Sequence, residues 1–267
     1  LPLLVIDGGC RTRPNIPCIE VGGSCGEKVT TGHAVKNVRQ AYEYGKILGA
    51  ELARTYDYVV ISESVAGGTT TALAVLLAMG TVRENLVSSS SPNNPKQLKM
   101  DTVMAGLQAA GLEIGDLADD PLKAIECVGD PMQPVNVGMI VGAAPHVPVI
   151  VGGGTQMAAV MAAAVKLAPE TVGNIMQGTT RWLLADRNAS MPGLVSAISP
   201  RIPIVYINMD YSESPYEGLQ AYEWGYIKEG VGCGGASVAA VISSAGGITC
   251  PMLLDRVHAV YREIMHL

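Results

Sequence analysis

Short, unbroken apolar runs and longer amphipathic stretches alternate along this chain. The runs are rich in Val, Ile and Leu, and four of them stand out: residues 3–6, 58–61, 148–151 and 204–207. Runs of this length without alternation are typical of strands in a parallel sheet whose two faces are both covered. The pattern therefore predicts a buried, mainly parallel sheet.

Stretches in which apolar residues recur every three or four positions separate these runs, as expected for helices. They cover residues 33–52 and 95–111, and residues 253–267 close the chain as an amphipathic surface helix. In the second stretch, Asn94 is the expected N-cap and Pro95 the expected first helical residue. Strands that alternate with helices indicate an α/β fold of three layers with right-handed crossovers.

One local pattern occurs three times, in residues 59–80, 149–165 and 228–247. The first two copies read strand, glycine turn and apolar helix, and the third gives the glycine turn and the helix again. In open α/β sheets, ligands bind outside the carboxyl ends of the strands, where such turns gather. We therefore expect the three turns to converge on one site.

The composition is that of a compact enzyme with a large apolar core. Of the 267 residues, 48% are apolar and 16% are charged, and 31 are glycines that allow close backbone contacts. This length is near the upper limit for one hydrophobic core, so residues 1–267 are expected to form a single domain. The opening LPLLVI has neither a starting Met nor a basic leader, and we expect the native protein to extend further at this end.

Charge and cysteine content exclude several classes of function. The formal net charge is −6 with no cluster of Lys and Arg, which argues against a nucleic-acid partner. The longest apolar stretch, residues 137–154, is interrupted by Pro145, His146 and Pro148, so no membrane span is expected. The six cysteines form no CxxC pair and have no zinc-type spacing with His, which indicates reduced thiols, a cytoplasmic protein and no metal.

Glu229 stands at the mouth of a glycine-rich run, KEGVGCGG, that leads into an apolar helix. It is a candidate for removing a proton or matching a positive charge, and a plain helix cap is the alternative.

In SESVAGGTTTA, Gly67 and Gly68 permit a sharp turn. Thr69 and Thr70 can present hydroxyls to an anion at a helix N-terminus; a threonine-capped helix is the alternative. The stretch matches neither a Walker loop nor GxGxxG, and no cofactor is expected.

Two further stretches carry candidate charges. Lys99 lies about one turn inside the helix that follows the polar loop SSSSPNNP, and it is placed to reach a phosphate as a point charge. An exposed helix lysine is the alternative.

Arg181, beside Trp182, is suited to binding a carboxylate or stacking on a ring. The alternative is that it forms a surface salt bridge with Asp186. Cys233 has no His near it in the sequence and is interpreted as a small buried thiol.

Together these stretches resemble one family along almost the whole chain. The motifs are SES-x-x-GGTTTALAVLLA, SSSSPNNP, VGDPM, GGGTQMAAV, TTRW and KEGVG-x-GGA. They are similar to motifs of the nicotinate-nucleotide–dimethylbenzimidazole phosphoribosyltransferases, and most similar to the archaeal and cyanobacterial branch of that family. The resemblance implies a Rossmann-like domain with a small helical lobe, a homodimer, and an N-terminal segment, absent here, that helps to form the base pocket.

The resemblance assigns roles to individual residues. In the bacterial branch the first motif is a Gly-Glu-Met-Gly-Ile-Gly-Asn-Thr-Thr loop, of which Val65 and Gly68 replace a Gly and an Asn. Lys99 falls on a phosphate-binding lysine, and Glu229 falls on the acid of a Leu-Gly-Glu-Gly motif that the family uses as the catalytic base. Lys228 replaces the preceding glycine and is expected to bring a second positive charge to the phosphate or the nicotinate carboxylate. The expected substrate contacts are Glu63, Gly67, Gly68, Thr69, Thr70, Ser90, Lys99, Gly153, Gly154, Thr180, Lys228 and Gly230.

The activity that the resemblance implies is the transfer of phosphoribose from nicotinate mononucleotide to dimethylbenzimidazole. Its products are nicotinate and α-ribazole phosphate, which supplies the lower ligand of cobalamin. Two alternatives stay open: a phosphoribosyltransferase that acts on another base, of the adenine or phenol type, and a non-catalytic nucleotide-binding protein. The acid, the lysine and the threonine loop together favour an enzyme, because a binding protein needs the phosphate site but not a base.

Overall fold

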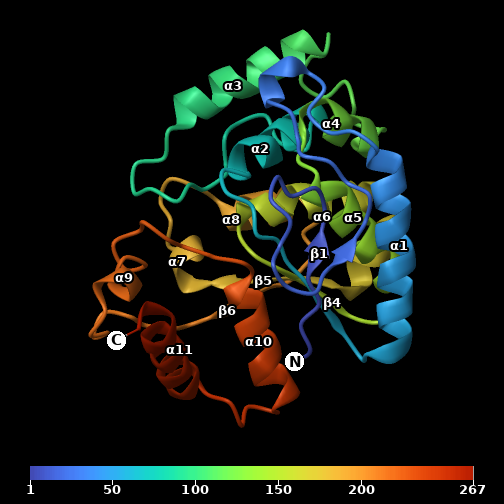
Figure 1. Ribbon diagram of the computed structural model, residues 1–267. Coiled ribbons are helices and arrows are strands. Elements are labelled where there is room, and N and C mark those ends of the chain that lie inside the picture. Colours follow the sequence, from blue (N-terminus) through green and yellow to red (C-terminus); the bar gives the residue numbers. More distant parts are fainter. Residues whose placement is uncertain (267) are drawn as a thin grey trace.

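Four parallel strands form the main sheet of the protein, which is described by a computed structural model over residues 1–266 (Figure 1). The strands are β3 (Val59–Ile61), β4 (Val149–Gly152), β5 (Ile175–Thr180) and β6 (Ile204–Ile207). They lie side by side in the order of the sequence, and each neighbouring pair is parallel. The predicted α/β fold with a mainly parallel sheet is therefore confirmed.

The strand expected at residues 3–6 is the one that does not belong to this sheet. Strand β1 (Ile6–Asp7) pairs with β2 (Ile19–Glu20) in a separate two-stranded parallel sheet. The apolar residues before β1 are not part of the core, since Leu1 and Leu3 are largely exposed. The prediction is wrong here because an apolar run does not by itself reveal which strands it lies beside.

Strand β5 escapes prediction because its sequence, IMQGTT, is polar over most of its length. The side chains of Gln177, Thr179 and Thr180 are nevertheless fully buried. A buried polar side chain needs a hydrogen-bond partner. The two threonines find such partners at the candidate site.

Helices make up most of the other regular structure of the described chain. They are α1 (Val38–Thr55), α2 (Thr69–Ala78), α3 (Lys96–Ala109), α4 (Pro121–Val128), α5 (Met132–Ala143), α6 (Thr155–Leu167), α7 (Arg181–Leu184), α8 (Met191–Ile198), α9 (Glu217–Gln220), α10 (Cys233–Ser243) and α11 (Cys250–Met265), with 3₁₀ turns η1 (Val29–Thr31) and η2 (Pro169–Asn174). The three long helices predicted from the spacing of apolar residues correspond to α1, α3 and α11.

The ends of these helices differ from the prediction in detail. Helix α3 has Pro95 as its N-cap residue, and the Asn94 side chain does not cap it. The Asn94 amide instead donates to the carbonyl of Val87 at 2.8 Å, so it is already engaged in the preceding loop. The closing helix begins at Cys250, and Leu267 of its expected range lies outside the described residues.

Helices lie against both faces of the main sheet (Figure 1). Helix α10 contacts all four strands on one face, while α5 contacts β3 and α6 contacts β4. Because the strands follow one another in sequence order, right-handed crossovers bring the connecting helices together on the face opposite α10. The chain therefore has the three layers that were expected.

At Gly235, helix α10 packs directly on the backbone of the sheet. Its residue Gly235 packs on Gly152 of β4 and on Gly178 of β5. A Cβ atom at Gly178 would lie 2.8 Å from the Gly235 Cα, and a Cβ atom at Gly235 would collide with the Gly152 Cα. This contact holds the first turn of α10 at the carboxyl ends of the strands.

Two smaller groups of elements flank the sheet. Helices α3 and α4 pack with η1 and correspond to the expected helical lobe (Figure 1). A second apolar cluster has Trp182, Ile207, Tyr211 and Val238 at its centre, and Leu253 of α11 packs against it. Among the described helices, none combines the length and the apolar character that a membrane span requires.

Candidate active site

The three glycine turns converge, as the sequence predicts. Thr179, near the end of β5, donates from its hydroxyl to the Glu229 Oε2 at 3.2 Å. Gly154, after β4, faces the same residue, since a Cβ built there would lie 3.6 Å from the Glu229 Cβ. Glu63, which follows β3, is near enough for the Glu229 charge to raise its pKa. Segments far apart in the sequence thus meet at one edge of the sheet.

Glu229 sits at the N-terminus of α10. Its Oε1 accepts a hydrogen bond from the Gly234 N–H at 3.0 Å, where the free amides of a helix favour a negative charge. Burial raises the pKa of this carboxyl group, against the lowering effect of its bonds from Gly234, Cys233 and Thr179. The helix-cap contact is therefore real. It also leaves a buried carboxylate that takes up a proton more readily than an exposed one does, as a general base requires.

Glu63 is the second acid of the site. Its Oε2 accepts from the Val65 N–H at 2.6 Å. Burial raises its pKa to about 7, and the charges of Asp130 and Glu229 act in the same direction. A carboxyl group with this pKa is about half protonated at neutral pH. It can therefore donate or accept a hydrogen bond to a hydroxyl or a ring nitrogen.

Asp130 is a third acid, which the sequence did not single out. It lies in the VGDPM motif, just before α5, where its Oδ1 accepts from the Met132 N–H at 3.0 Å. Burial raises its pKa. The only signal in the sequence was an acid placed between glycine and proline, a pattern that turns commonly show.

The N-terminus of α2 offers unused donors. Gly67 has a φ of +76°, and Gly68 is the N-cap residue, so the chain turns sharply before Thr69. The Thr71 hydroxyl bonds to the Gly68 carbonyl at 2.9 Å. Across residues 1–266, the Thr69 and Thr70 hydroxyls have no hydrogen-bond partner, and no threonine side chain caps the helix. This end of α2 is therefore free to bind an anion.

Residues 88–91, the serine loop, lie between two buried lysines. Lys99 is only 5% exposed and donates to the Ser88 carbonyl at 2.5 Å. Lys228 is 7% exposed and donates to the carbonyls of Ser89 at 2.8 Å and Ser91 at 3.2 Å. The reading of Lys99 as an exposed helix lysine is therefore wrong. Burial, and then the neighbouring charge of Lys228, lowers its pKa to about 8.

Asp186 pairs with Lys228, and not with Arg181 as the salt-bridge alternative proposed. The Lys228 Nζ lies 3.2 Å from the Asp186 Oδ2. Burial opposes ionisation of Asp186, but bonds from the Ser88 hydroxyl at 2.6 Å and the Asn188 N–H at 2.9 Å, together with Lys228, hold its pKa below the usual range. Asp186 is therefore a buried, charged partner of the serine loop.

Arg181 clamps carboxylates of the chain itself. Its Nη2 lies 2.6 Å from both carboxylate oxygens of Glu223 and 3.2 Å from Asp210. Its guanidinium also lies over the Trp182 ring, 5.3 Å from the ring centroid. Both sequence-based ideas, the clamp and the ring stacking, thus hold for partners within the protein. Asp186 was the wrong partner because Glu223, distant in sequence, approaches from the loop before α10.

The remaining candidates surround the same edge of the sheet. Gly153 has a φ of +146° and donates from its N–H to the Gly178 carbonyl at 3.0 Å. The Thr180 hydroxyl donates to the Lys228 carbonyl, and Gly230 lies beside the Tyr222 hydroxyl. Ser90 is exposed at the tip of the serine loop. All the predicted residues therefore lie on segments that adjoin Glu229, α2 or the serine loop.

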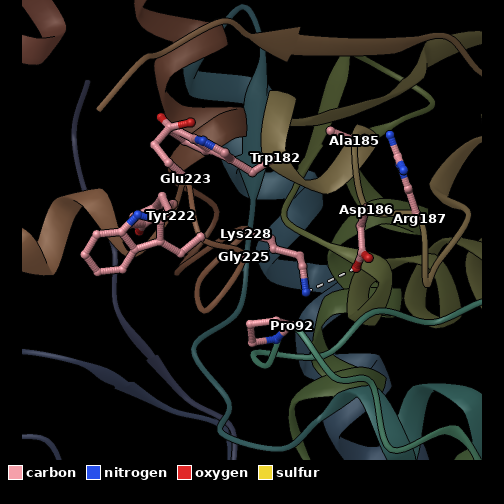
Figure 2. A pocket seen from close by; sticks show the side chains of 10 residues that line it. Pro92, Trp182, Ala185, Asp186, Arg187, Tyr222, Glu223, Gly225 and Lys228 are labelled. Atoms are coloured by element: carbon pink, nitrogen blue, oxygen red, sulfur yellow. Dashed lines mark ion pairs between the residues drawn. The ribbon is translucent and has the colours of Figure 1, made fainter. Parts of the chain in front are cut away.

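Lys228 helps to line a cavity of about 210 Å³. Figure 2 shows the side chains around it. Pro92, Trp182, Tyr222 and Trp224 contribute to its walls, and the Lys228–Asp186 ion pair lies at its edge. Glu63, Lys99 and Glu229 do not line this cavity. It is therefore separate from the edge of the sheet where the acids meet.

Cys233, in the first turn of α10, is not activated. Burial raises the pKa of its thiol to about 12, and the charge of Glu229 adds to the effect. A thiol with such a pKa stays protonated at neutral pH, whereas a nucleophilic cysteine acts as the thiolate. Cys233 is half-buried rather than fully buried, and its raised pKa agrees with the interpretation that it is not a catalytic thiol.

The chain belongs to the phosphoribosyltransferase family, because the sequence model of that family matches residues 3–182. Within it, the chain is similar to UPF0284 proteins of archaea and of a cyanobacterium. It is 37% identical to that of Methanopyrus kandleri over 267 residues, which are 99% of this chain and 69% of the relative. The identity is 41% over 237 residues for Methanosarcina acetivorans (88% and 66%) and 40% over 252 residues for Trichodesmium erythraeum (90% and 67%). The chain thus spans about two thirds of these relatives.

Two solved structures from Thermus thermophilus share the fold. One is a nicotinate-nucleotide-dimethylbenzimidazole phosphoribosyltransferase, with a TM-score of 0.53 and 18% identity over 73% of this chain and 57% of that one. The other is CobT, with a TM-score of 0.53 and 18% identity over 80% of this chain and 63% of that one. These similarities confirm the α/β fold of parallel strands flanked by helices, while the sequence model and the UPF0284 relatives confirm the family resemblance.

Proposed function

We propose that this protein transfers phosphoribose from nicotinate mononucleotide to dimethylbenzimidazole. The observation that carries the proposal is the buried Glu229 carboxylate, held by Thr179 and Gly234 where the turns after β3, β4 and β5 meet. A phosphate subsite lies on adjoining segments, at the free end of α2 and at Lys99. Membership of the phosphoribosyltransferase family and the shared fold support the same reaction class.

The proposed reaction exchanges one carbon–nitrogen bond for another. A benzimidazole ring nitrogen attacks the anomeric carbon, and the bond from that carbon to the nicotinate ring nitrogen breaks. The nitrogen of nicotinate is positively charged while bonded, so it takes the electron pair and leaves without needing an acid. Attack from the opposite face turns a β-nucleotide into an α-nucleotide. The proton on the second benzimidazole nitrogen passes to Glu229.

The other residues bind and orient the substrates in this proposal. Lys99, Thr69 and Thr70 hold the phosphate, and Glu63 orients the ribose or the incoming base. The glycines of the turns allow a flat ring and the ribose phosphate to approach the backbone. The remaining contacts proposed for the substrates are Gly67, Gly68, Ser90, Gly153, Gly154, Thr180 and Gly230. For Lys228 we propose an indirect part, through the serine loop.

The proposed function is tested by mixing the protein with nicotinate mononucleotide and dimethylbenzimidazole. Free nicotinate and α-ribazole phosphate are followed by chromatography, and both are expected in equal amounts. Binding of nicotinate mononucleotide without product would favour an enzyme that acts on another base, and adenine and phenols are the next acceptors. Absence of both binding and product would overturn the proposal.

Replacing Lys99 by Met is expected to weaken nicotinate mononucleotide binding by about 10- to 100-fold, the range for losing a hydrogen bond to a charged group. The reason is that the Lys99 ammonium has one partner in the described chain, the Ser88 carbonyl, and so has donors to spare for a phosphate. Calorimetry on both proteins measures the affinity. Lys96→Met, at an exposed position of the same helix, is the control. Equal affinity of Lys99→Met and wild type would contradict the assignment.

We also propose that residues 1–267 form one domain and that the protein assembles as a homodimer, as the family resemblance implies. Light scattering of the purified protein measures its mass directly. A monomer across the concentration range of the activity assay would contradict the dimer.

A further inference from the structure

We propose that Lys228 and Asp186 are a positioning pair, which fastens the serine loop beside Lys99 and so prepares the phosphate subsite without touching the substrate. This inference rests on the proposed function in one respect only, the assignment of Lys99 to the phosphate. The contacts, the spare donors and the charge balance around Ser88 carry it.

Three charged side chains meet at Ser88. Asp186 accepts from the Ser88 hydroxyl at 2.6 Å, and Lys99 donates to the Ser88 carbonyl at 2.5 Å. Lys228 reaches the same Asp186 at 3.2 Å (Figure 2). All three are buried, and buried charges are costly unless they are paired. Two cations lie near one carboxylate, which pairs with Lys228, so the cluster holds an excess positive charge that suits an anionic ligand.

The two lysines differ in how many of their donors are used. An ammonium group has three N–H donors. Lys228 has three acceptors, namely Asp186 and the carbonyls of Ser89 and Ser91. Lys99 has one, the Ser88 carbonyl, within the described chain. Lys99 is therefore the ammonium that is free to bind a phosphate, and Lys228 is committed to the loop.

Lys228 also connects the serine loop to the proposed base. Its carbonyl accepts from the Thr180 hydroxyl at the end of β5, and the next residue in the chain is Glu229. The Ser88 N–H, on the other side, donates to the Thr155 hydroxyl at the start of α6, at 2.9 Å. The pair thus links the phosphate subsite and the segment that carries the base through one short chain of contacts.

The charges of Lys228 and Asp186 shift the pKa of Lys99 in opposite directions. Burial is the main cause that lowers the Lys99 pKa to about 8; the charge of Lys228 also lowers it, Asp186 acts to raise it, and Lys96 adds the last lowering effect. Of the elements that pack against α3, η1 and α2 carry no charged residue, and on α4 Lys123 and Glu126 pair with each other. Removing the Lys228 charge should therefore raise the Lys99 pKa, and removing the Asp186 charge should lower it.

The decisive experiment titrates Lys99 directly, without any ligand. Lysine labelled with ¹³C at Cε is followed by NMR over pH, and the Lys99→Met variant identifies the Lys99 signal. We expect the Lys99 midpoint to move up in Lys228→Met and down in Asp186→Asn, in which the amide oxygen can still accept from Lys228. Lys166→Met removes a lysine that pairs with the exposed Asp119, and it should leave the midpoint unchanged.

An ion pair that stabilises the fold without setting the charge around Lys99 would leave the Lys99 midpoint unchanged in both variants. Midpoints that move in the same direction in both variants, or in neither, would overturn the inference. Thermal melting establishes that each variant is folded, and Lys228→Gln replaces Lys228→Met where the methionine variant does not fold.

Ligand binding gives a second readout. Affinity for nicotinate mononucleotide is measured by calorimetry between about pH 7.5 and 9.5, where the phosphate is already a dianion. We expect both variants to bind about tenfold more weakly at the lower pH, because the loop has lost an anchor. The loss of affinity with rising pH should shift to higher pH in Lys228→Met and to lower pH in Asp186→Asn. A wild-type protein that does not bind this nucleotide would contradict the proposed function, while the NMR titration would still decide on the pair.

Discussion

Replacement of Glu229 by Gln is expected to lower turnover by about 10²- to 10⁴-fold, the usual contribution of a general base. Glutamine keeps the size of the side chain and an oxygen that can accept from the Gly234 N–H, as Glu229 does at 3.0 Å. It cannot take up the benzimidazole proton. The variant should therefore fold and bind nicotinate mononucleotide within a few-fold of wild type, while the chemical step becomes slow.

The pH dependence of turnover provides an independent check on Glu229. A general base works only when ionised, so turnover should rise as the pH passes the pKa of its carboxyl group. Because burial raises that pKa, the rise should lie above the range of an exposed glutamate, and it should vanish in Glu229→Gln. Glu217→Gln, at an exposed position of α9, serves as the matched control. Turnover of Glu229→Gln within a few-fold of wild type would refute the assignment.

Replacement of Gly235 by Ala should have the second large effect, on stability and activity together. The added methyl group would meet the backbone of Gly152, which cannot rotate away as a side chain can. Forcing extra atoms into a packed contact typically costs about 1–3 kcal/mol. Helix α10 would have to move off the sheet and carry the Gly234 N–H away from Glu229. We therefore expect a loss in the free energy of unfolding and a fall in turnover of at least about tenfold.

Urea unfolding and steady-state kinetics measure these two effects of Gly235→Ala. Gly173→Ala is the matched control, because a Cβ at Gly173 has no atom within 4 Å. It should change neither stability nor turnover appreciably. If Gly235→Ala were as stable and active as the control, the close packing of α10 on the sheet would not be what positions the base.

The sequence was enough to predict a parallel sheet, but not to predict every strand that belongs to it. The apolar runs that became β3 and β4 are almost entirely buried, and such strands reveal themselves by hydrophobicity alone. The run that became β6 is only partly buried, and its Tyr206 is exposed. Strand β5 could not be found in this way, because its buried threonines are satisfied by residues about 50 positions away, as in the bond from Thr179 to Glu229. Long-range partners of this kind leave no local pattern in the chain.

In the candidate site, too, some residues could be predicted from the sequence and others could not. Glu229, Lys99 and the glycine turns are visible as motifs, because each needs a particular residue beside a particular turn. The partner of Lys228 was not visible, since Asp186 is distant in the sequence and approaches it only through the fold. Predicting the burial of Lys99 and the change in its pKa requires knowing which charges surround it, and that depends on the tertiary structure.

The order of the strands also bears on how the protein is made. Strands β3 to β6 are neighbours in space in the order in which a ribosome releases them, so each one can join the edge of the sheet formed before it. Helix α10 emerges after all of them, with Glu229 just ahead of it. A nascent chain that stops before α10 therefore has a sheet with one face uncovered, and it lacks the Gly234 N–H that holds Glu229. Translation must pass Ser243, the end of α10, before the sheet is covered and the proposed base is held in place.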